Sequence, residues 1–397
     1  MLKSKLLILF IISLIPCCIE VDISAPSFPE IARYFNVSEG KVELTIAYNF
    51  FGFWISSLIY GPLSECYGRR RIMIVGNTLL LVGAFGCGMA STMDQLLGWR
   101  FIQGLGASTS AVLVFAMVAD IYKGQEAVRI ISIMNATLTL ILAIAPVVGS
   151  VINQLCGWRG NYYVVWWITL ISWVLLFKQL PETKKNLRRF LFKKIYQDYM
   201  KLFNSLEFMF SSLVPSLFYG CYVAFITSAP FLYMKTFNLP IFTYACHQAL
   251  IIGIFSGVSL FSTQFVKHFG KKHCIIWGVS MAIISISILN TCNLFELNYP
   301  LLITGCMVVF CIGFALCYPL IFTISLELFP TIKGPASSLT MALRAFICAM
   351  VVGLTSIFYN GNPFSLFFII LMVTIVIFLI TKYYLLKKVF NFHDNKK

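Results

Sequence analysis

Long apolar segments recur along the whole chain and limit the folds open to it. A helix needs about 20 mostly apolar residues to cross a bilayer. Twelve segments of the 397-residue chain meet that length: residues 6–26, 44–63, 72–90, 96–122, 128–152, 158–177, 208–234, 241–266, 274–292, 300–326, 335–358 and 364–384. The chain is 59% hydrophobic and only 11% charged, which is more apolar than a soluble domain. We therefore predict an all-α membrane protein with twelve transmembrane helices.

The positions of the basic residues predict the orientation of these helices. In the loops, Lys and Arg gather on the side that holds both termini, whereas the other side has only Arg33, Lys41, Arg159 and Lys235. Loops rich in Lys and Arg stay in the cytoplasm, so we expect both termini to be cytoplasmic. The net charge of +15 follows from these loops, and we expect no nucleic-acid partner.

The sequence has no clear motif for a cofactor site or for a cleaved leader segment. The 13 cysteines lie mostly in apolar segments without CxxC spacing, and no GxxxxGK[ST] motif is present. We therefore expect no disulfide framework, metal site, ATP site or other cofactor, and no enzyme activity. The basic and apolar start also resembles a signal peptide, but Pro16 before Cys17 makes a poor cleavage site.

Short motifs that recur 202 to 207 residues apart indicate a duplicated chain. SAP at 24–26 recurs at 228–230, and Phe-Asn at 35–36 recurs at 237–238. We predict two six-helix bundles, residues 1–180 and 207–397, the second with a short cytoplasmic tail. A basic linker, residues 181–206, joins them and includes an amphipathic helix at 191–203 on the inner membrane surface. Internal repeats are typical of secondary transporters, whose binding site lies between the halves.

Two acids, Glu20 and Asp22, lie inside the first apolar segment. A carboxylate at bilayer depth costs roughly 2.5–3.5 kcal/mol, so it normally faces a protein interior or a watery cavity. Asp22 and Arg100 each lie about one turn from the outer end of their segments, and we expect them to meet as an ion pair or hydrogen bond. The second half has Ile226 and Thr304 at the matching positions, so we expect coupling in the first half.

These three charged residues admit two interpretations. Asp22 and Arg100 form either a static bridge or a proton-coupling pair, in which burial favours the neutral acid and the arginine favours the charged one. Residues two apart on a helix point about 200° apart, so only one of the two acids faces the cavity centre. Glu20 remains either a second cation-facing acid or an accident at the cavity wall.

Further candidate residues lie in other segments. His247 is either a proton relay or an interfacial residue, and the helix 5 residues Ala145, Pro146 and Gly149 form either a kink in a packing helix or a pivot between the halves. Gly104 and Gly106 permit close helix approach near Arg100. An aromatic cavity for lipophilic cations is expected from Tyr48, Asn49, Trp54, Tyr219, Phe225 and Phe231.

Several motifs together resemble the major facilitator superfamily, and specifically its Bcr/CflA-type drug-resistance branch. The motifs, in chain order, are DISAPSFPEIA, GPLSECYGRRR, WRFIQGLGAS, APVVGS, LPET and SSLTMALRAF. The resemblance implies a monomer with the major facilitator fold in a cell membrane, which would be the inner membrane of a bacterium. It also implies proton-coupled multidrug efflux.

By position, the resemblance makes Asp22 the membrane-embedded acid and Arg100 the arginine near the proton site. It also implies an inner gate that faces helix 11 and stabilises the outward-open state, formed by Gly61, Glu65, Gly68, Arg69, Arg70 and Asp120. Five residues depart from the family pattern: Glu65 replaces an Asp, Cys66 an Arg, Ser24 a Tyr, Ser150 a Gly and Glu20 a small polar residue.

We therefore predict a proton-coupled antiporter that exports lipophilic or cationic drugs by alternating access. Its partners are a small-molecule substrate, protons and the lipid bilayer. One alternative is a transporter of a metabolite such as a sugar or amino acid on the same fold. Another, from a different class, is a non-transporting membrane sensor or assembly protein. A channel is disfavoured because no filter or ring of charges is evident.

Overall fold

The structure is a computed structural model that describes residues 2–122, 125–184, 187, 192–329, 332–359 and 361–389. Parts of the predicted linker (185–186 and 188–191) and of the predicted tail (390–397) lie outside the described residues. The described elements are all helical, with no strand among them. They are α1 (Leu2–Ser24), η1 (Ala25–Ser27), α2 (Phe28–Phe35), α3 (Glu39–Tyr67), α4 (Arg69–Met89), α5 (Met93–Ile121), α6 (Gln125–Gln179), α7 (Phe192–Phe203), α8 (Leu206–Pro230), η2 (Phe231–Thr236), α9 (Ile241–Phe269), α10 (Lys271–Leu294), α11 (Pro300–Glu327), α12 (Lys333–Phe358), α13 (Pro363–Ile380) and η3 (Thr381–Val389).

The helices confirm the predicted fold class. Within the described residues, 11 helical runs are long and apolar enough to cross a membrane. One of them, α6, covers two predicted segments and changes direction at Gly157, whose φ of 69° is left-handed and strongly favours glycine. Each of the twelve predicted segments therefore lies in a helix. Local apolar length is enough to predict these elements because every backbone polar group in a bilayer must be paired within its own helix.

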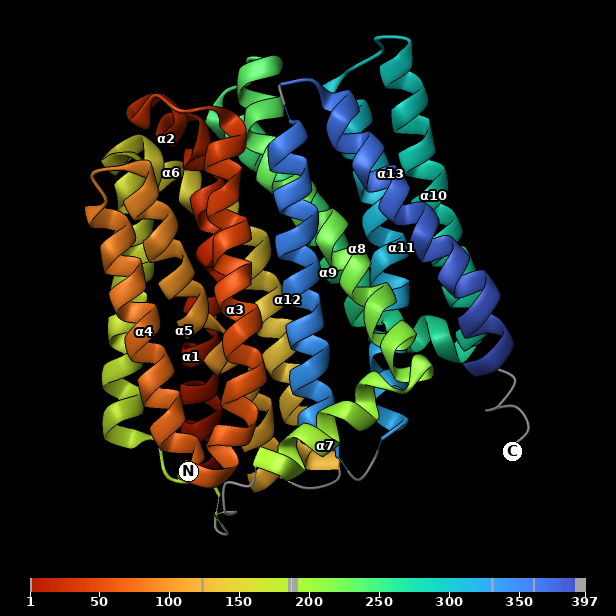
Figure 1. Ribbon diagram of the computed structural model, residues 1–397. Coiled ribbons are helices and arrows are strands. Elements are labelled where there is room, and N and C mark those ends of the chain that lie inside the picture. The colour runs from red at the N-terminus through yellow and green to blue at the C-terminus, as the bar shows by residue number, and fades with distance from the viewer. Residues whose placement is uncertain are drawn as a thin grey trace.

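The helices form two bundles that stand side by side (Figure 1). Helices α1 to α6 make the first bundle and α8 to α13 the second. Helix α1 begins, and η3 ends, at the same end of the molecule, which is named the termini face here; the opposite end is the far face. The ranges 1–180, 181–206 and 207–397 for the two halves and the linker remain predictions.

Helix α7 crosses the termini face and contacts both bundles (Figure 1). The Tyr199 hydroxyl donates to the carbonyl of Leu58 in α3 at 3.0 Å, and Leu202 packs in one apolar cluster with Ala336 and Leu339 of α12. Burial raises the pKa of the Tyr199 phenol, so it remains a neutral donor. The predicted amphipathic segment is helical as expected, and its buried side contacts protein.

Helix α1 ends at Ser24, two residues before the predicted end at Pro26, but the chain stays helical beyond it. The chain continues through η1 into α2, so that residues Lys5–Phe35 form one helical run of 31 residues. Pro26 and Pro29 are tolerated there because they lie in the first turns of η1 and α2, where a backbone N–H needs no partner within the helix. Glu20 and Asp22 consequently lie near the middle of this run and not one turn from its end.

Glycines allow three helices of the first bundle to pack backbone to backbone. A Cβ atom at Gly104 of α5 would overlap the carbonyl of Asn49 in α3, and one at Gly106 would overlap the backbone of Leu80 in α4. The predicted close approach near Arg100 is thus confirmed. Gly98, on the same helix, faces open space with no neighbour within 4 Å.

We expect Gly104→Ala to destabilise the first bundle. The added methyl group must push α3 away from α5, and overpacking of this kind costs about 1–3 kcal/mol. The matched control is Gly98→Ala, which adds a methyl group to open space and should be neutral or stabilising by about 0.5–1 kcal/mol. Thermal unfolding of the detergent-purified chain measures both. Equal melting temperatures for the two variants would contradict the close packing.

Candidate functional site

Arg100 lies fully buried in the first bundle among neutral polar groups. One of its terminal nitrogens donates to Oε1 of Gln103 at 3.0 Å, and the other donates to Oγ of Ser24 at 3.0 Å. Its Cζ atom lies 5.3 Å from the ring centre of Tyr162. The side chain is 0% exposed, and its Nε atom has no hydrogen-bond partner among the described residues. A buried cation held this way needs a nearby negative charge.

Glu20 supplies that charge through Asn49. The side-chain amide of Asn49 donates to Oε1 of Glu20 at 3.2 Å and also to the backbone carbonyl of Arg100 at 3.4 Å. Glu20 is 2% exposed and lies within electrostatic range of Arg100, although no ion pair within 4.0 Å joins the two among the described residues. Residues from α1, α3 and α5 thus form one buried network, which is named the Arg100 network here: Ser24, Glu20, Asn49, Arg100 and Gln103.

The expected pairing of Asp22 with Arg100 is wrong in this structure. On α1, Glu20 and Ser24 are four residues apart and share the face toward α3 and α5, whereas Asp22 lies about 200° around the helix from Glu20. The prediction that the two acids point to different sides is consistent with this arrangement. The acid that joins Arg100 is Glu20.

Asp22 instead faces the second bundle. Its carboxylate lies within electrostatic range of three phenols from the second bundle: Tyr219, Tyr222 and Tyr244. It is 9% exposed, and no cation lies within 4.0 Å of it among the described residues. Next to Asp22 in α1, the carbonyl of Ile23 packs against Gly149 of α6. Asp22 is therefore a carboxylate at the interface between the bundles, backed by a tight helix contact.

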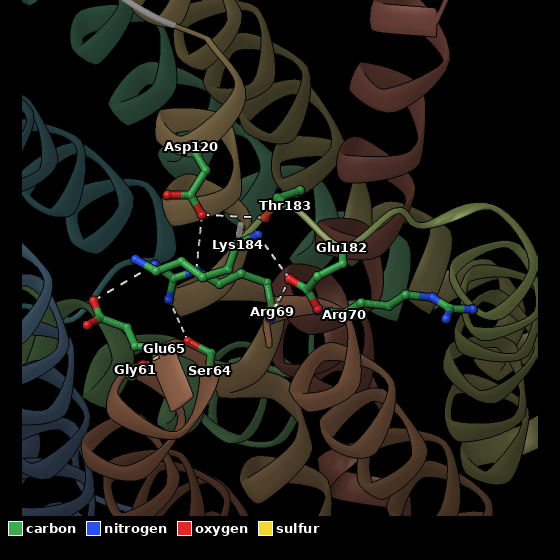
Figure 2. Close-up of polar contacts among 9 residues, drawn as sticks. All are labelled: Gly61, Ser64, Glu65, Arg69, Arg70, Asp120, Glu182, Thr183 and Lys184. Carbon is green, nitrogen blue, oxygen red and sulfur yellow. Dashed lines mark hydrogen bonds and ion pairs between the residues drawn. The ribbon is translucent and has the colours of Figure 1, made fainter. Parts of the chain in front are cut away.

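A second polar cluster lies at the termini face and centres on Arg69 (Figure 2). Its Nε atom pairs with Oδ2 of Asp120 at 3.2 Å, and its terminal nitrogens lie 2.5 Å from Oγ of Ser64 and 4.0 Å from Oε1 of Glu65. Arg69 is 6% exposed, so water screens these contacts little. The structure thus brings together Glu65, Arg69 and Asp120, which the resemblance assigned to the inner gate.

Glu182 completes this cluster, although the sequence pointed to it only as part of LPET. Its carboxylate accepts hydrogen bonds from the backbone N–H groups of Arg69 at 2.9 Å and Arg70 at 3.2 Å (Figure 2). A carboxylate at the first N–H groups of a helix offsets the helix dipole and pairs orphan donors. Gly68 precedes them with a φ of 98°, and a Cβ atom there would overlap Glu182. The remaining gate residue, Arg70, donates to the carbonyl of Phe177 at 2.8 Å.

We expect Glu182→Ala to loosen the start of α4 by about 1–2 kcal/mol, the usual effect of losing a charged cap. Glu182→Gln keeps one acceptor oxygen and should lose less. The control is Asp94→Ala, an acid in the first turn of α5 whose side chain is 79% exposed, which should change little. Hydrogen exchange of the amides of Arg69 and Arg70 measures the effect, and unchanged exchange in Glu182→Ala would rule out the cap.

A cavity of about 570 Å³ lies beside the Arg69 cluster. Its wall includes Glu65, Arg69 and Asp120 from the first bundle, Asp198 from α7, and Pro335 and Ser338 from α12. A Cβ atom at Gly61 would overlap the Ser338 hydroxyl, and one at Gly334 would lie 3.4 Å from Glu65. Gly61 and Glu65 thus face α12, the eleventh predicted helix, as the resemblance implied.

Contacts between the bundles close the far face. Glu39 pairs with Lys235, and the ring of Phe231 lies 6.4 Å from the rings of both Phe28 and Tyr359. A Cβ atom at Gly40 would overlap the backbone of Ser356 in α12. The cavity at the termini face and these far-face contacts show a molecule hollowed at one end and sealed at the other.

Glu43 is a buried acid in this seal that the sequence did not reveal. It is 0% exposed, and neither carboxylate oxygen has a hydrogen-bond partner within the described chain. Its neighbours include the hydroxyls of Ser228 in α8 and Ser356 in α12, which do not reach hydrogen-bond geometry. Glu43 directly precedes the predicted segment 44–63, so it passed for a loop residue.

The six residues of the expected aromatic cavity do not come together. Tyr48 is 44% exposed on the outward face of α3, Asn49 belongs to the Arg100 network, and Trp54 packs 5.0 Å from the ring of Phe346 in α12. Phe225 is 0% exposed in the core of the second bundle, and Phe231 lies in the far-face seal. Only Tyr219 lies near Asp22. Sequence cannot separate lining rings from packing rings because both are apolar.

The remaining candidates from the sequence are residues 145–149 of α6 and His247 of α9. Helix α6 continues through Ala145 and Pro146 to Gly149, which contacts α1. His247 is only partly buried, and its Nδ1 atom lies 2.8 Å from the hydroxyl of Thr304, the residue that aligns with Arg100. No group of three or more His, Cys, Asp or Glu side chains suited to a metal occurs in the described part of the chain.

Comparison with known proteins decides the family. The family model described as Major Facilitator Superfamily matches residues 10–353. The chain belongs to the major facilitator superfamily. This is a family of multi-pass membrane transporters and not of enzymes, so the predictions of fold and of a non-enzyme are confirmed.

Relatives within this superfamily carry drug-resistance names. The chain is 25% identical over 359 residues to a bicyclomycin resistance protein homolog of Haemophilus influenzae, covering 88% of each chain. It is 21% identical over 333 residues to the chloramphenicol resistance protein CraA of Acinetobacter baumannii, covering 83% of this chain and 80% of that one. These names confirm the predicted resemblance to the Bcr/CflA-type branch.

A solved structure shows the same major facilitator fold. The xylose transporter XylE of E. coli, in a partially occluded inward-open conformation, superposes with a TM-score of 0.77 at 13% identity. The match covers 96% of this chain and 97% of that one. At this identity the likeness concerns the fold alone.

Proposed function

We propose that this major facilitator protein is a proton-coupled antiporter that exports lipophilic small molecules, cationic drugs among them, by alternating access. The drug-resistance names of its relatives support drugs as the substrate class and export as the direction of transport. The charged residues of the first bundle support proton coupling. Of the residues proposed for the coupling site, Asp22 carries the proton, and Glu20 and Arg100 position its helix.

The observation that carries the proposal is the position of Asp22. An acid in the membrane without a cation beside it is expensive unless it meets water or takes up a proton. Asp22 lies on the interface that separates in alternating access, opposite phenols of the second bundle. Glu20, by contrast, is held by Asn49 inside one bundle. We infer that Asp22 carries the proton and that the Arg100 network fixes the helix that holds it.

The two ends of the molecule support alternating access. We propose that the termini face is cytoplasmic, because the basic loops lie there. The cavity beside the Arg69 cluster then faces the cytoplasm while the far-face seal is closed. Substrate would enter from the cytoplasm in this state. The Arg69 cluster would stabilise the outward-open state by packing more closely against α12.

The driving force is sufficient for export. One charge that moves down a potential of 100 mV releases about 2.3 kcal/mol. A factor of ten in concentration corresponds to about 1.36 kcal/mol. One proton per neutral substrate therefore supports an accumulation of about 50-fold. Exchange of one proton for a monovalent cation moves no net charge, so the pH difference alone drives it, by about tenfold per pH unit.

Purified protein in liposomes with an acidic lumen provides the test. We expect accumulation of the lipophilic cation ethidium when the outside is alkaline, and its loss when a protonophore collapses the gradient. Protein-free liposomes measure leakage. A gradient that moves xylose or an amino acid but not ethidium would favour a metabolite transporter, and no gradient-driven transport of any of these would favour a sensor or assembly protein.

A further inference from the structure

Arg344 is a cation at mid-depth of the second bundle that has no acidic partner. It lies 11 residues after the start of α12 and 14 before its end. No Asp or Glu within the described residues lies within 4.0 Å of its guanidinium. A cation in the membrane interior is expensive and normally marks a ligand, an ion pair or a water-filled path. The sequence placed Arg344 in a helix and gave it no role.

Two tyrosines hold the Arg344 side chain. One terminal nitrogen, Nη1, donates to the hydroxyl of Tyr318 in α11 at 2.9 Å. The Cζ atom lies 4.8 Å from the ring centre of Tyr219 in α8, a cation–π distance. Three helices of the second bundle therefore orient the guanidinium, but neither tyrosine supplies a negative charge.

One edge of this guanidinium remains available. Tyr318 is its one hydrogen-bond partner among the described residues, so Nε and Nη2 donate to no protein group there. Neither atom is among the buried polar atoms of the described residues that lack a hydrogen-bond partner, whereas Nε of Arg100 is. Nε and Nη2 form the fork that binds a carboxylate with two parallel hydrogen bonds.

The guanidinium lies beside the interface between the bundles. The ring of Tyr219 lies 6.2 Å from that of Phe50 in α3 of the first bundle. Tyr219 also lies within electrostatic range of both Arg344 and Asp22. Transporters built from two repeats bind substrate near the bilayer midplane at this interface.

Aromatic rings continue from the guanidinium into the second bundle. Consecutive ring centres are 6.2 Å apart from Tyr222 to Phe255, 4.8 Å from Phe255 to Phe314 and 5.3 Å from Phe314 to Tyr318. These four residues form what is named the aromatic wall here: Tyr222, Phe255 and Tyr318 are partly exposed, and Phe314 is buried among them. An apolar wall with a few convergent polar groups is typical of a small-molecule site.

We propose that Nε and Nη2 of Arg344 bind an anionic oxygen group of the substrate, whose planar apolar body packs on the aromatic wall. The substrate class is thus an aromatic carboxylate or a molecule with an equivalent anionic oxygen. The inference rests on the proposed function in that the interface must admit a small molecule. It extends that function beyond cations, because Asp22 and Arg344 carry opposite charges and both lie within electrostatic range of Tyr219.

Three probes of one shape test the charge preference: 2-naphthoate, neutral 2-naphthamide and cationic 2-naphthylmethylammonium. Binding to the full-length, detergent-purified chain is measured by calorimetry, without a pH gradient. We expect wild type to bind 2-naphthoate about tenfold or more tighter than 2-naphthamide, as charge-assisted hydrogen bonds imply. Arg344→Gln should abolish this difference while 2-naphthamide affinity changes less than about threefold.

Two further variants separate binding from structure. Arg344→Lys keeps the charge without the fork and should retain part of the preference. The control Arg159→Gln removes an arginine that stacks on Tyr34 and Trp158 at the far face and should keep the full preference.

The proposal is overturned if Arg344→Gln weakens all three probes equally, if wild type binds 2-naphthoate no more tightly than 2-naphthamide, or if 2-naphthoate does not bind. Failure of the proposed function has a different signature: the carboxylate preference persists in the binding assay, but no pH gradient drives transport of any probe into liposomes.

Discussion

Asp22→Asn is expected to reduce gradient-driven accumulation of ethidium from about tenfold per pH unit to none, within the error of leakage. Asparagine has nearly the same shape but takes up no proton, so substrate movement loses its link to the proton gradient. The measurement is ethidium accumulation in liposomes at a fixed pH difference, with proton release by the purified protein on substrate addition as a second readout.

The fold should tolerate this substitution. Asp22 has no cation within 4.0 Å among the described residues, so its replacement leaves no charge unpaired. We expect the melting temperature to stay the same or to rise, because a buried acid is removed. Exchange of labelled for unlabelled ethidium across the membrane, without a gradient, should also persist.

The matched control for Asp22→Asn is Glu20→Gln, which changes the neighbouring acid on the opposite face of α1. Gradient-driven transport should survive in Glu20→Gln, at a reduced rate. Loss of coupling in Glu20→Gln together with intact coupling in Asp22→Asn would assign the proton to the Arg100 network and overturn the role given to Asp22.

Arg100→Met is expected to destabilise the protein by about 3–5 kcal/mol, because removal of one partner from a buried charged network leaves the other without compensation. The group left behind is Glu20, which is 2% exposed and bonded to Asn49. Ser24 and Gln103 also lose a hydrogen-bond donor. Thermal and denaturant unfolding of the purified variant measure the loss.

A second substitution identifies the acid that belongs to Arg100. Arg100→Met combined with Glu20→Gln removes both charges and should restore at least half of the lost stability. Arg100→Met combined with Asp22→Asn should restore little, because Asp22 faces the other bundle. Rescue by Asp22→Asn but not by Glu20→Gln would show that the arginine pairs with the interface acid after all.

Much of the fold was predictable from the sequence because its signals are local. Each predicted segment is helical since apolar length alone decides whether a helix spans a bilayer. The angle between Glu20 and Asp22 also follows from the sequence, because it depends only on 100° per residue. The first α-helix ends at Ser24, close to the predicted end at Pro26, but the helical run that continues through η1 and α2 was not predicted.

The partners of the charged residues depended on the packing of helices distant in sequence. Glu182 caps α4 from more than 100 residues away, and Arg344 meets tyrosines on two other helices. The failed aromatic cavity has the same origin, since composition does not say which face of a helix meets which neighbour.

The sequence by itself determined the membrane class, the helical segments, the family motifs and the presence of two acids on different faces of α1. Only the tertiary structure decided that Glu20 joins Arg100 and that Asp22 faces the second bundle. The physical reason is that apolar length and helix periodicity act within one segment. The rotation of each helix, by contrast, follows from close packing at residues such as Gly104 and Gly149, which no single segment reveals.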